Sequence, residues 1–165
     1  DYRIDACVMH PRFSHEKFKR RARWETFPWV AEHCSAPLIA NGDICSPDDI
    51  TRHREWFDAV DGIMIGRMAV VKPWIFREFA GEQYKLDYWK VWKRFFQYVS
   101  DDFPPEKSIG RVKQFTAYYS RNFFFGHQLY RAVLSARTTT DMYERAKQFL
   151  CSSPQISVSP SVMGI

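Results

Sequence analysis

Glycines and charged residues follow two consecutive apolar runs of this sequence, where they could bind a phosphate group. Asn41-Gly42-Asp43 ends the run that begins at Pro37, and Gly66-Arg67 ends the next run, 25 residues later. Glycine lets main-chain N–H groups approach an anion closely, and arginine adds a planar fork of donors. An earlier run ends on His10-Pro11-Arg12, which we expect to face the same ligand. Each signal alone is common, and a single histidine is usually structural, but three in register at successive units form a specific constellation.

Short strands must position these residues. The runs 3–10, 36–41 and 61–66 are apolar and short, as buried strands are. Helical patterns lie between and after them, over 14–34, 47–60 and 72–81, with Ser14 and Ser46 as candidate N-caps. Strands that alternate with helices indicate βα units on a parallel sheet, in which ligands bind where strands end and helices begin.

Beyond Gly81 the strand pattern stops and the sequence becomes helical throughout. Helical periodicity covers 84–103, 109–124, 126–136 and 139–150, with Thr139 or Thr140 as the candidate cap of the last helix. The Ser- and Pro-rich end predicts a flexible tail. The sequence therefore predicts three parts: an α/β part over 1–81, an all-helical domain over 82–150 and a tail over 151–165.

Charge is unevenly distributed along the chain. Residues 1–81 hold twelve basic and twelve acidic residues, whereas 82–150 hold twelve basic and seven acidic ones, which accounts for the whole net charge of +5. A basic region rich in aromatic residues suits a polyanion such as nucleic acid, although a solvated basic helix face explains the charge equally well. A second basic cluster, 12–23, contains a single acidic residue.

Several classes of protein are disfavoured by composition. No apolar run approaches the roughly 18 residues of a membrane span, and the first residues lack the apolar core of a signal peptide. We therefore expect a soluble cytoplasmic protein with no membrane partner. The four cysteines are widely spaced and form no CxxC pair, so we expect reduced thiols and no metal site.

The motifs together resemble one enzyme family. HPR, PLIANGDI, DGIMIGR and PWIF resemble the second part of the flavin barrel of tRNA-dihydrouridine synthases, and 111–150 resembles the C-terminal helical domain of that family. The resemblance covers about 3–150. It implies the last βα units of a TIM-type barrel, incomplete in this chain, followed by a helical tRNA-binding domain. It also implies FMN as cofactor, NADPH as reductant and tRNA as substrate, with reduction of the uracil C5–C6 bond and protonation of C5 by a cysteine.

The same resemblance assigns roles to individual residues. The FMN-binding residues would be His10, Asn41, Gly42, Asp43, Gly66 and Arg67. The RNA-binding residues would be Arg12, Lys19, Arg20, Arg21, Arg111, Lys113 and Arg121. The family usually has glycine where this chain has Pro11, which has no N–H to offer to a phosphate.

A complete barrel needs eight strands, and only three are evident here. The other strands and the catalytic cysteine would precede Asp1, because no cysteine of this chain has the surroundings that the family requires. The isolated chain is therefore expected to be inactive and to need the missing barrel half, in the same polypeptide or in a second chain. Two alternatives stay open: a non-catalytic RNA-binding module, and another FMN-barrel oxidoreductase that acts on a small molecule.

Overall fold

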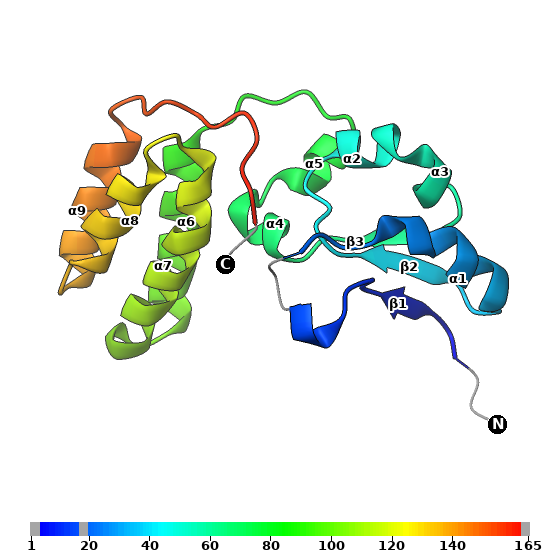
Figure 1. Cartoon of the computed structure of the whole chain (residues 1–165). Coiled ribbons are helices and arrows are strands. Elements are labelled where there is room, and N and C mark those ends of the chain that lie inside the picture. The colour runs from blue at the N-terminus through cyan, green and yellow to red at the C-terminus, as the bar shows by residue number, and fades with distance from the viewer. Residues whose placement is uncertain (1–3, 17–19, 163–165) are drawn as a thin grey trace. The chain divides into compact units, whose positions relative to one another are not determined.

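The computed structural model describes residues 4–16 and 20–162, which form two compact units (Figure 1). The sheet unit consists of the described residues in 1–69, together with 74–81 and Val162. The helical unit consists of 70–73 and 82–161. Lys19 lies outside the described residues.

Three parallel strands form the sheet among the described residues: β1 (Cys7–Met9), β2 (Leu38–Asn41) and β3 (Gly62–Met64). They pair in the order of the chain, with Val8 opposite Ile39 and Ile39 opposite Gly62. The three predicted strands and their parallel direction are confirmed, although each is shorter than the apolar run that contains it.

The two faces of this sheet differ in burial. Leu38 and Ala40 of β2 point into a core that includes Phe27 and Phe57, and Cys7 and Met9 of β1 pack against it. The opposite face carries Val8 and Met64, which are 46% and 43% exposed. One face is therefore covered by helices, whereas the other leaves apolar side chains accessible.

Short helices cover the buried face. Those that contribute to its core are η2 (Trp24–Thr26), α1 (Phe27–His33), α2 (Pro47–Arg52), α3 (Arg54–Phe57) and α5 (Ile75–Phe79). Two further short helices, η1 (Ser14–Glu16) and α4 (Arg67–Val71), contribute no residue to this core. Ser46 and Asp49 form a reciprocal capping box at the start of α2, as the Ser-Pro-Asp-Asp sequence predicts. The predicted helix over 47–60 is interrupted at His53, whose backbone leaves the helical region.

The predicted helix that begins at Ser14 is wrong for the described residues. Only the single turn η1 forms there, because the Glu16 carboxylate binds elsewhere. It accepts from the Phe13 N–H at 3.1 Å and from Nη1 of Arg23 at 2.7 Å. These bonds fix the Glu16 side chain at the end of η1 and lower its pKa to about 2, chiefly through the hydrogen bond from Arg23.

The helical unit contains α6 (Tyr88–Asp102), α7 (Pro105–Tyr119), η3 (Ser120–Asn122), α8 (Gly126–Leu134) and α9 (Thr139–Leu150). Figure 1 shows the four α-helices packed side by side: α7 contacts α6 and α8, and α9 contacts α8 and α6. Thr138, one residue before the predicted cap, caps α9 by accepting from the Asp141 N–H, since it is the last residue with extended backbone. No helix in the described part of the chain is long and apolar enough to cross a membrane.

The end of the chain is tied down over its described part, in contrast to the predicted flexible tail. Ile156 forms an antiparallel bridge with Phe123, and the Ser157 N–H donates to the Asn122 carbonyl at 2.8 Å. The Phe124 N–H donates to the Gln155 carbonyl at 3.0 Å. Val162, at the end of the described segment, is buried.

The core of the helical unit contains a buried polar contact that can be tested. The indole N–H of Trp92 donates to Oγ1 of Thr116 at 3.0 Å, and both residues are fully buried. Thr116→Val should lower the free energy of unfolding by about 1–3 kcal/mol, because the isosteric valine offers the indole no acceptor. Urea unfolding of the intact protein, followed by circular dichroism, measures this loss. Thr140→Val, at an exposed position of α9, is the control; equal stability of both variants would contradict the prediction.

Candidate functional site

A pocket of about 230 Å³ lies at the carboxyl ends of the three strands. The predicted phosphate-site residues all line it: His10, Asn41, Gly42, Asp43, Gly66 and Arg67. They come from loops that are far apart in the sequence, and parallel pairing in chain order brings the three strand ends to one edge of the sheet. The sequence pattern therefore predicts correctly that these residues gather.

The turn after β2 depends on glycine. Gly42 has φ +115°, and Asp43 follows with φ 55°, so the chain passes through two positive-φ residues. A Cβ on Gly42 would lie 2.9 Å from Cβ of Ala22 and 2.9 Å from Cδ2 of His10. The Gly42 carbonyl also accepts from the indole N–H of Trp24 at 2.7 Å. This close packing fixes where the Asp43 side chain points.

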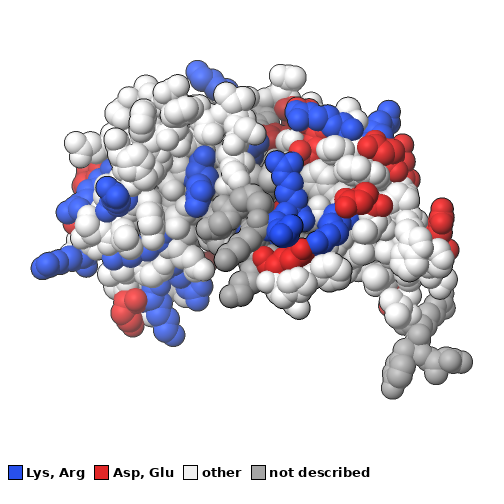
Figure 2. Space-filling model, in the orientation of Figure 1, with Lys and Arg blue, Asp and Glu red and all other residues white. Residues whose placement is uncertain are grey.

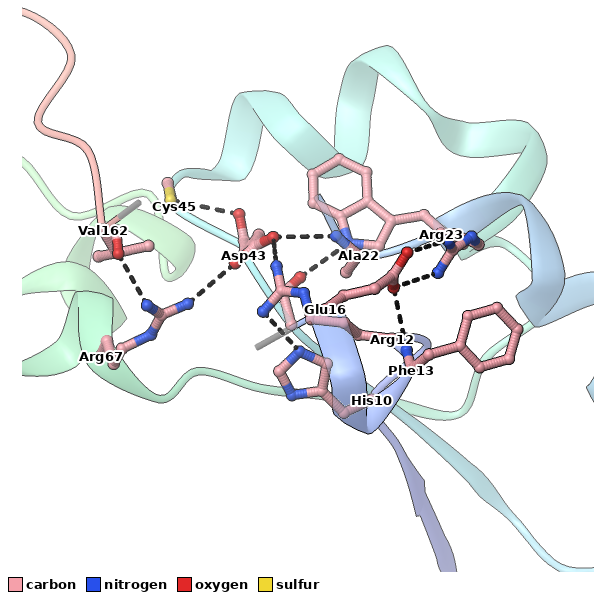
Figure 3. A network of polar contacts seen from close by, with 12 residues as sticks. His10, Arg12, Phe13, Glu16, Ala22, Arg23, Asp43, Cys45, Arg67 and Val162 are labelled. Carbon is pink, nitrogen blue, oxygen red and sulfur yellow. Dashed lines mark hydrogen bonds and ion pairs between the residues drawn. The ribbon is translucent and has the colours of Figure 1, made fainter. Parts of the chain in front are cut away.

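The Asp43 carboxylate is the centre of the polar network (Figure 3). One oxygen accepts from Arg12 and from the Ala22 N–H, the latter at 2.9 Å. The other oxygen accepts from Nη2 of Arg67 at 3.1 Å. The Asp43 side chain is only 10% exposed, so its charge is stabilised mainly by these donors.

Arg67 is held by a second acceptor that sequence reasoning missed. Its Nη1 donates to the main-chain carbonyl of Val162 at 2.7 Å, and the buried Val162 lines the pocket. No motif in the C-terminal segment indicates this contact, because a main-chain carbonyl leaves no trace in residue type. Arg67 is therefore oriented by a carboxylate on one side and a carbonyl on the other.

His10 lies against the same network. Its Nε2 is 3.3 Å from Nη1 of Arg12. Burial lowers the pKa of His10 below its ordinary value of 6.5, and the charges of Arg12 and Arg67 lower it further, while Asp43 opposes them. This lowered pKa favours the neutral imidazole.

The chain is similar to proteins of one known family. The family model described as "Dihydrouridine synthase (Dus)" matches residues 3–149, nearly the whole chain. The chain belongs to the dihydrouridine synthase family. Among curated proteins, the tRNA-dihydrouridine(16) synthase of Aquipseudomonas alcaligenes is 33% identical over 162 residues, which cover 89% of this chain and 48% of that protein. The tRNA-dihydrouridine synthase B of Vibrio parahaemolyticus is 41% identical over 78 residues, 47% of this chain and 24% of that protein.

These relatives also bear on the expected incompleteness. The chain spans about half the length of the tRNA-dihydrouridine(16) synthase and about a quarter of the length of the synthase B named above. Within the described residues, no group of three His, Cys, Asp or Glu side chains could hold a metal ion.

The predicted RNA-binding residues of this dihydrouridine synthase chain lie in different settings. Arg12 does not offer its side chain to RNA: it is 4% exposed and paired with Asp43, because the loop before α1 folds over it. Arg20 and Arg21 are exposed on that loop. In the helical unit Arg121 is exposed, Lys113 is half-buried, and the Arg111 guanidinium lies 3.9 Å from the ring centre of Phe103.

The turn after β2 gives a direct test of the site's construction. Gly42→Ala should destabilise the protein by about 2–4 kcal/mol, because alanine is strained at this φ and its Cβ would overlap Ala22 and His10. Gly62→Ala is the matched control, since a Cβ there would stand an ordinary 3.6 Å from Ile39. Thermal unfolding of both variants measures the difference. Equal midpoints would show that the turn tolerates a side chain.

Proposed function

We propose that the protein carrying this chain reduces uridine to dihydrouridine in tRNA, with FMN as cofactor and NADPH as reductant. The observation that carries the proposal is the pocket at the strand ends in a chain of the dihydrouridine synthase family. Gly42, Gly66 and Arg67 line this pocket, and Asp43 pairs with both Arg67 and the buried Arg12. When bound, FMN would supply the hydride chemistry. The residues described here would bind and orient it, and the proton-donating cysteine is expected outside this chain.

The donor set of the pocket fits the phosphate of FMN. Guanidinium groups form paired hydrogen bonds with phosphate oxygens, and Arg67 lines the pocket. Gly66 leaves room beside it, since a Cβ there would meet no atom within 4 Å. Two arginines, one aspartate and a neutral histidine leave one net positive charge for the anion.

The sheet is what the last units of a barrel would supply. Its strands follow one another in chain order without a reversal, as neighbouring strands of a TIM-type barrel do. The accessible apolar face with Val8 and Met64 would become part of the barrel interior. We therefore infer that further strands, from the same polypeptide or a second chain, close the barrel and cover this face.

The phosphate assignment predicts a selective loss. Arg67→Ala should weaken FMN binding about 10–100-fold, because a charge-assisted contact to the phosphate is lost. Riboflavin, which lacks the phosphate, should bind the variant and the unchanged protein alike. Arg54→Ala, at an exposed arginine of α3, is the control for loss of charge. Titration by flavin fluorescence gives the affinities, and normal FMN binding by the Arg67 variant would refute this phosphate site.

The helical unit is proposed to bind the tRNA. Figure 2 shows Lys and Arg over the visible face of this unit with few acidic side chains among them, whereas both signs alternate over the sheet unit. The excess of basic residues is confined to 82–150 in the sequence. Phosphate contacts from such a surface account for affinity that does not depend on base sequence.

Salt dependence tests this role. Arg111→Ala and Arg121→Ala should each reduce the slope of log affinity against log salt for tRNA by about 1, because one phosphate contact is lost. Arg54→Ala, at an exposed arginine of α3 in the sheet unit, is the control with the same change of charge. Filter binding over a range of salt concentrations supplies the slopes. An unchanged slope in both arginine variants would remove these residues from the RNA surface.

A further inference from the structure

We propose that Arg12 is a positioning residue, which holds His10 as the neutral tautomer with its proton on Nδ1. In this form His10 offers the pocket one N–H donor and no charge. The proposal deepens the flavin site and rests on the proposed function only for the identity of the ligand. The tautomer itself follows from contacts within the sheet unit.

Arg12 is held in one place by buried contacts. Its side chain is 4% exposed, and Nη2 donates to the Asp43 carboxylate. That carboxylate is itself fixed by the Ala22 N–H and by Arg67. Figure 3 shows the resulting line of contacts from Arg67 through Asp43 and Arg12 to His10. The guanidinium that meets the imidazole is therefore not a mobile surface group.

The direction of the Arg12–His10 contact decides the tautomer. Every N–H of a guanidinium is a donor, and none of its nitrogens accepts. Nη1 of Arg12 lies 3.3 Å from Nε2 of His10, so Nε2 is the acceptor. A neutral imidazole has one protonated nitrogen, which must then be Nδ1.

The charges around the ring keep it neutral. Arg12, Arg67 and Asp43 are the charged groups that act on His10. Burial and the two arginines lower its pKa, and the single carboxylate does not compensate. Protonation would place a second N–H on Nε2, opposite the N–H of Arg12, where two donors would face each other. The network therefore resists the imidazolium form.

Pro11 brings the two side chains together. The Arg12 N–H donates to the His10 carbonyl at 2.8 Å, which closes a three-residue turn around Pro11. Proline suits the centre of such a turn, because its fixed φ is close to that of an inverse γ-turn. The Pro11 carbonyl is in turn held by the Arg23 N–H at 2.8 Å. The proline that departs from the family pattern thus favours the geometry that Arg12 needs.

Gly42 packs against the imidazole ring of His10. The position of a Cβ on Gly42 would be 2.9 Å from Cδ2 and 3.0 Å from Nε2 of His10. The Cδ2–Nε2 edge therefore packs against the turn after β2 and toward Arg12. We infer that the protonated Nδ1 is the nitrogen that serves the ligand, as an N–H donor to an acceptor oxygen.

Nitrogen NMR of the intact protein tests the tautomer directly. Histidines labelled with ¹⁵N report which ring nitrogen carries the proton, and a His10→Gln variant assigns the signal. We expect a neutral His10 with protonated Nδ1 and bare Nε2 at pH 7, and a midpoint of titration below 6.5. A signal for protonated Nε2, or for the imidazolium at pH 7, would overturn the proposal without any need for a further variant.

Two variants separate positioning from general structure. Arg12→Met should release Nε2, so that the Nε2-protonated form appears and the pKa of His10 rises toward 6.5. Asp43→Asn keeps the charge of Arg12 but replaces its ion pair with at most a neutral hydrogen bond, so it should hold the guanidinium less firmly and also produce a mixture of tautomers. Arg52→Met, at an exposed arginine of α2, should leave the His10 signals unchanged. An unaltered tautomer in both folded variants of the network would refute the role of Arg12.

FMN binding then separates this proposal from the proposed function. Arg12→Met should bind FMN about tenfold more weakly, because the ligand loses an oriented donor. A protein that binds no flavin but shows the expected His10 tautomer would refute the flavin site and leave the role of Arg12 standing. A protein that binds flavin but shows a protonated Nε2 on His10 would refute the role of Arg12 and leave the flavin site standing.

Discussion

The carboxylate of Asp43 ties together the ends of the three strands. It follows β2, and its partners Arg12 and Arg67 follow β1 and β3. A carboxylate with so little exposure requires cationic partners, and removal of one of them would leave a buried charge uncompensated. The positive-φ turn at Gly42 places this group between the two arginines. The position of each arginine, and of the histidine beyond Arg12, therefore depends on one side chain.

This arrangement also sets the charge that a ligand meets. Without Asp43, Arg67 in the pocket wall and Arg12 behind it would contribute two positive charges, and each side chain could adopt many orientations. Asp43 reduces the charge to one and restricts both side chains, so that little rotamer entropy remains to be lost on binding. The low pKa of His10 prevents a further charge at neutral pH. On our proposal, the pocket would bind an anion by oriented donors more than by net charge.

The sequence predicts the site better than the segments between its parts. The strand ends could be found because glycine and arginine after apolar runs leave a local pattern, and Ser46-Pro47 marks the start of α2 for the same reason. The helix expected from Ser14 was wrong, since the pairing of Glu16 with Arg23 is a tertiary contact that helical periodicity does not reveal. Burial of Arg12, and the contact of Arg67 with a carbonyl 95 residues away, likewise depend on folding at long range.

The two faces of the sheet differ in what covers them, which supports the proposal that further strands close a barrel. Helices cover the face with Leu38 and Ala40, so the accessible side chains of Val8 and Met64 lie on the opposite face. A sheet that stood alone would need helices on both faces to bury its apolar side chains. The helices that connect these strands pack on one face. In a closed barrel the same residues meet side chains from other strands and form layers. Met64 of this face also lines the pocket at the strand ends, so, on our proposal, strands that cover the face would also add to the walls of the pocket.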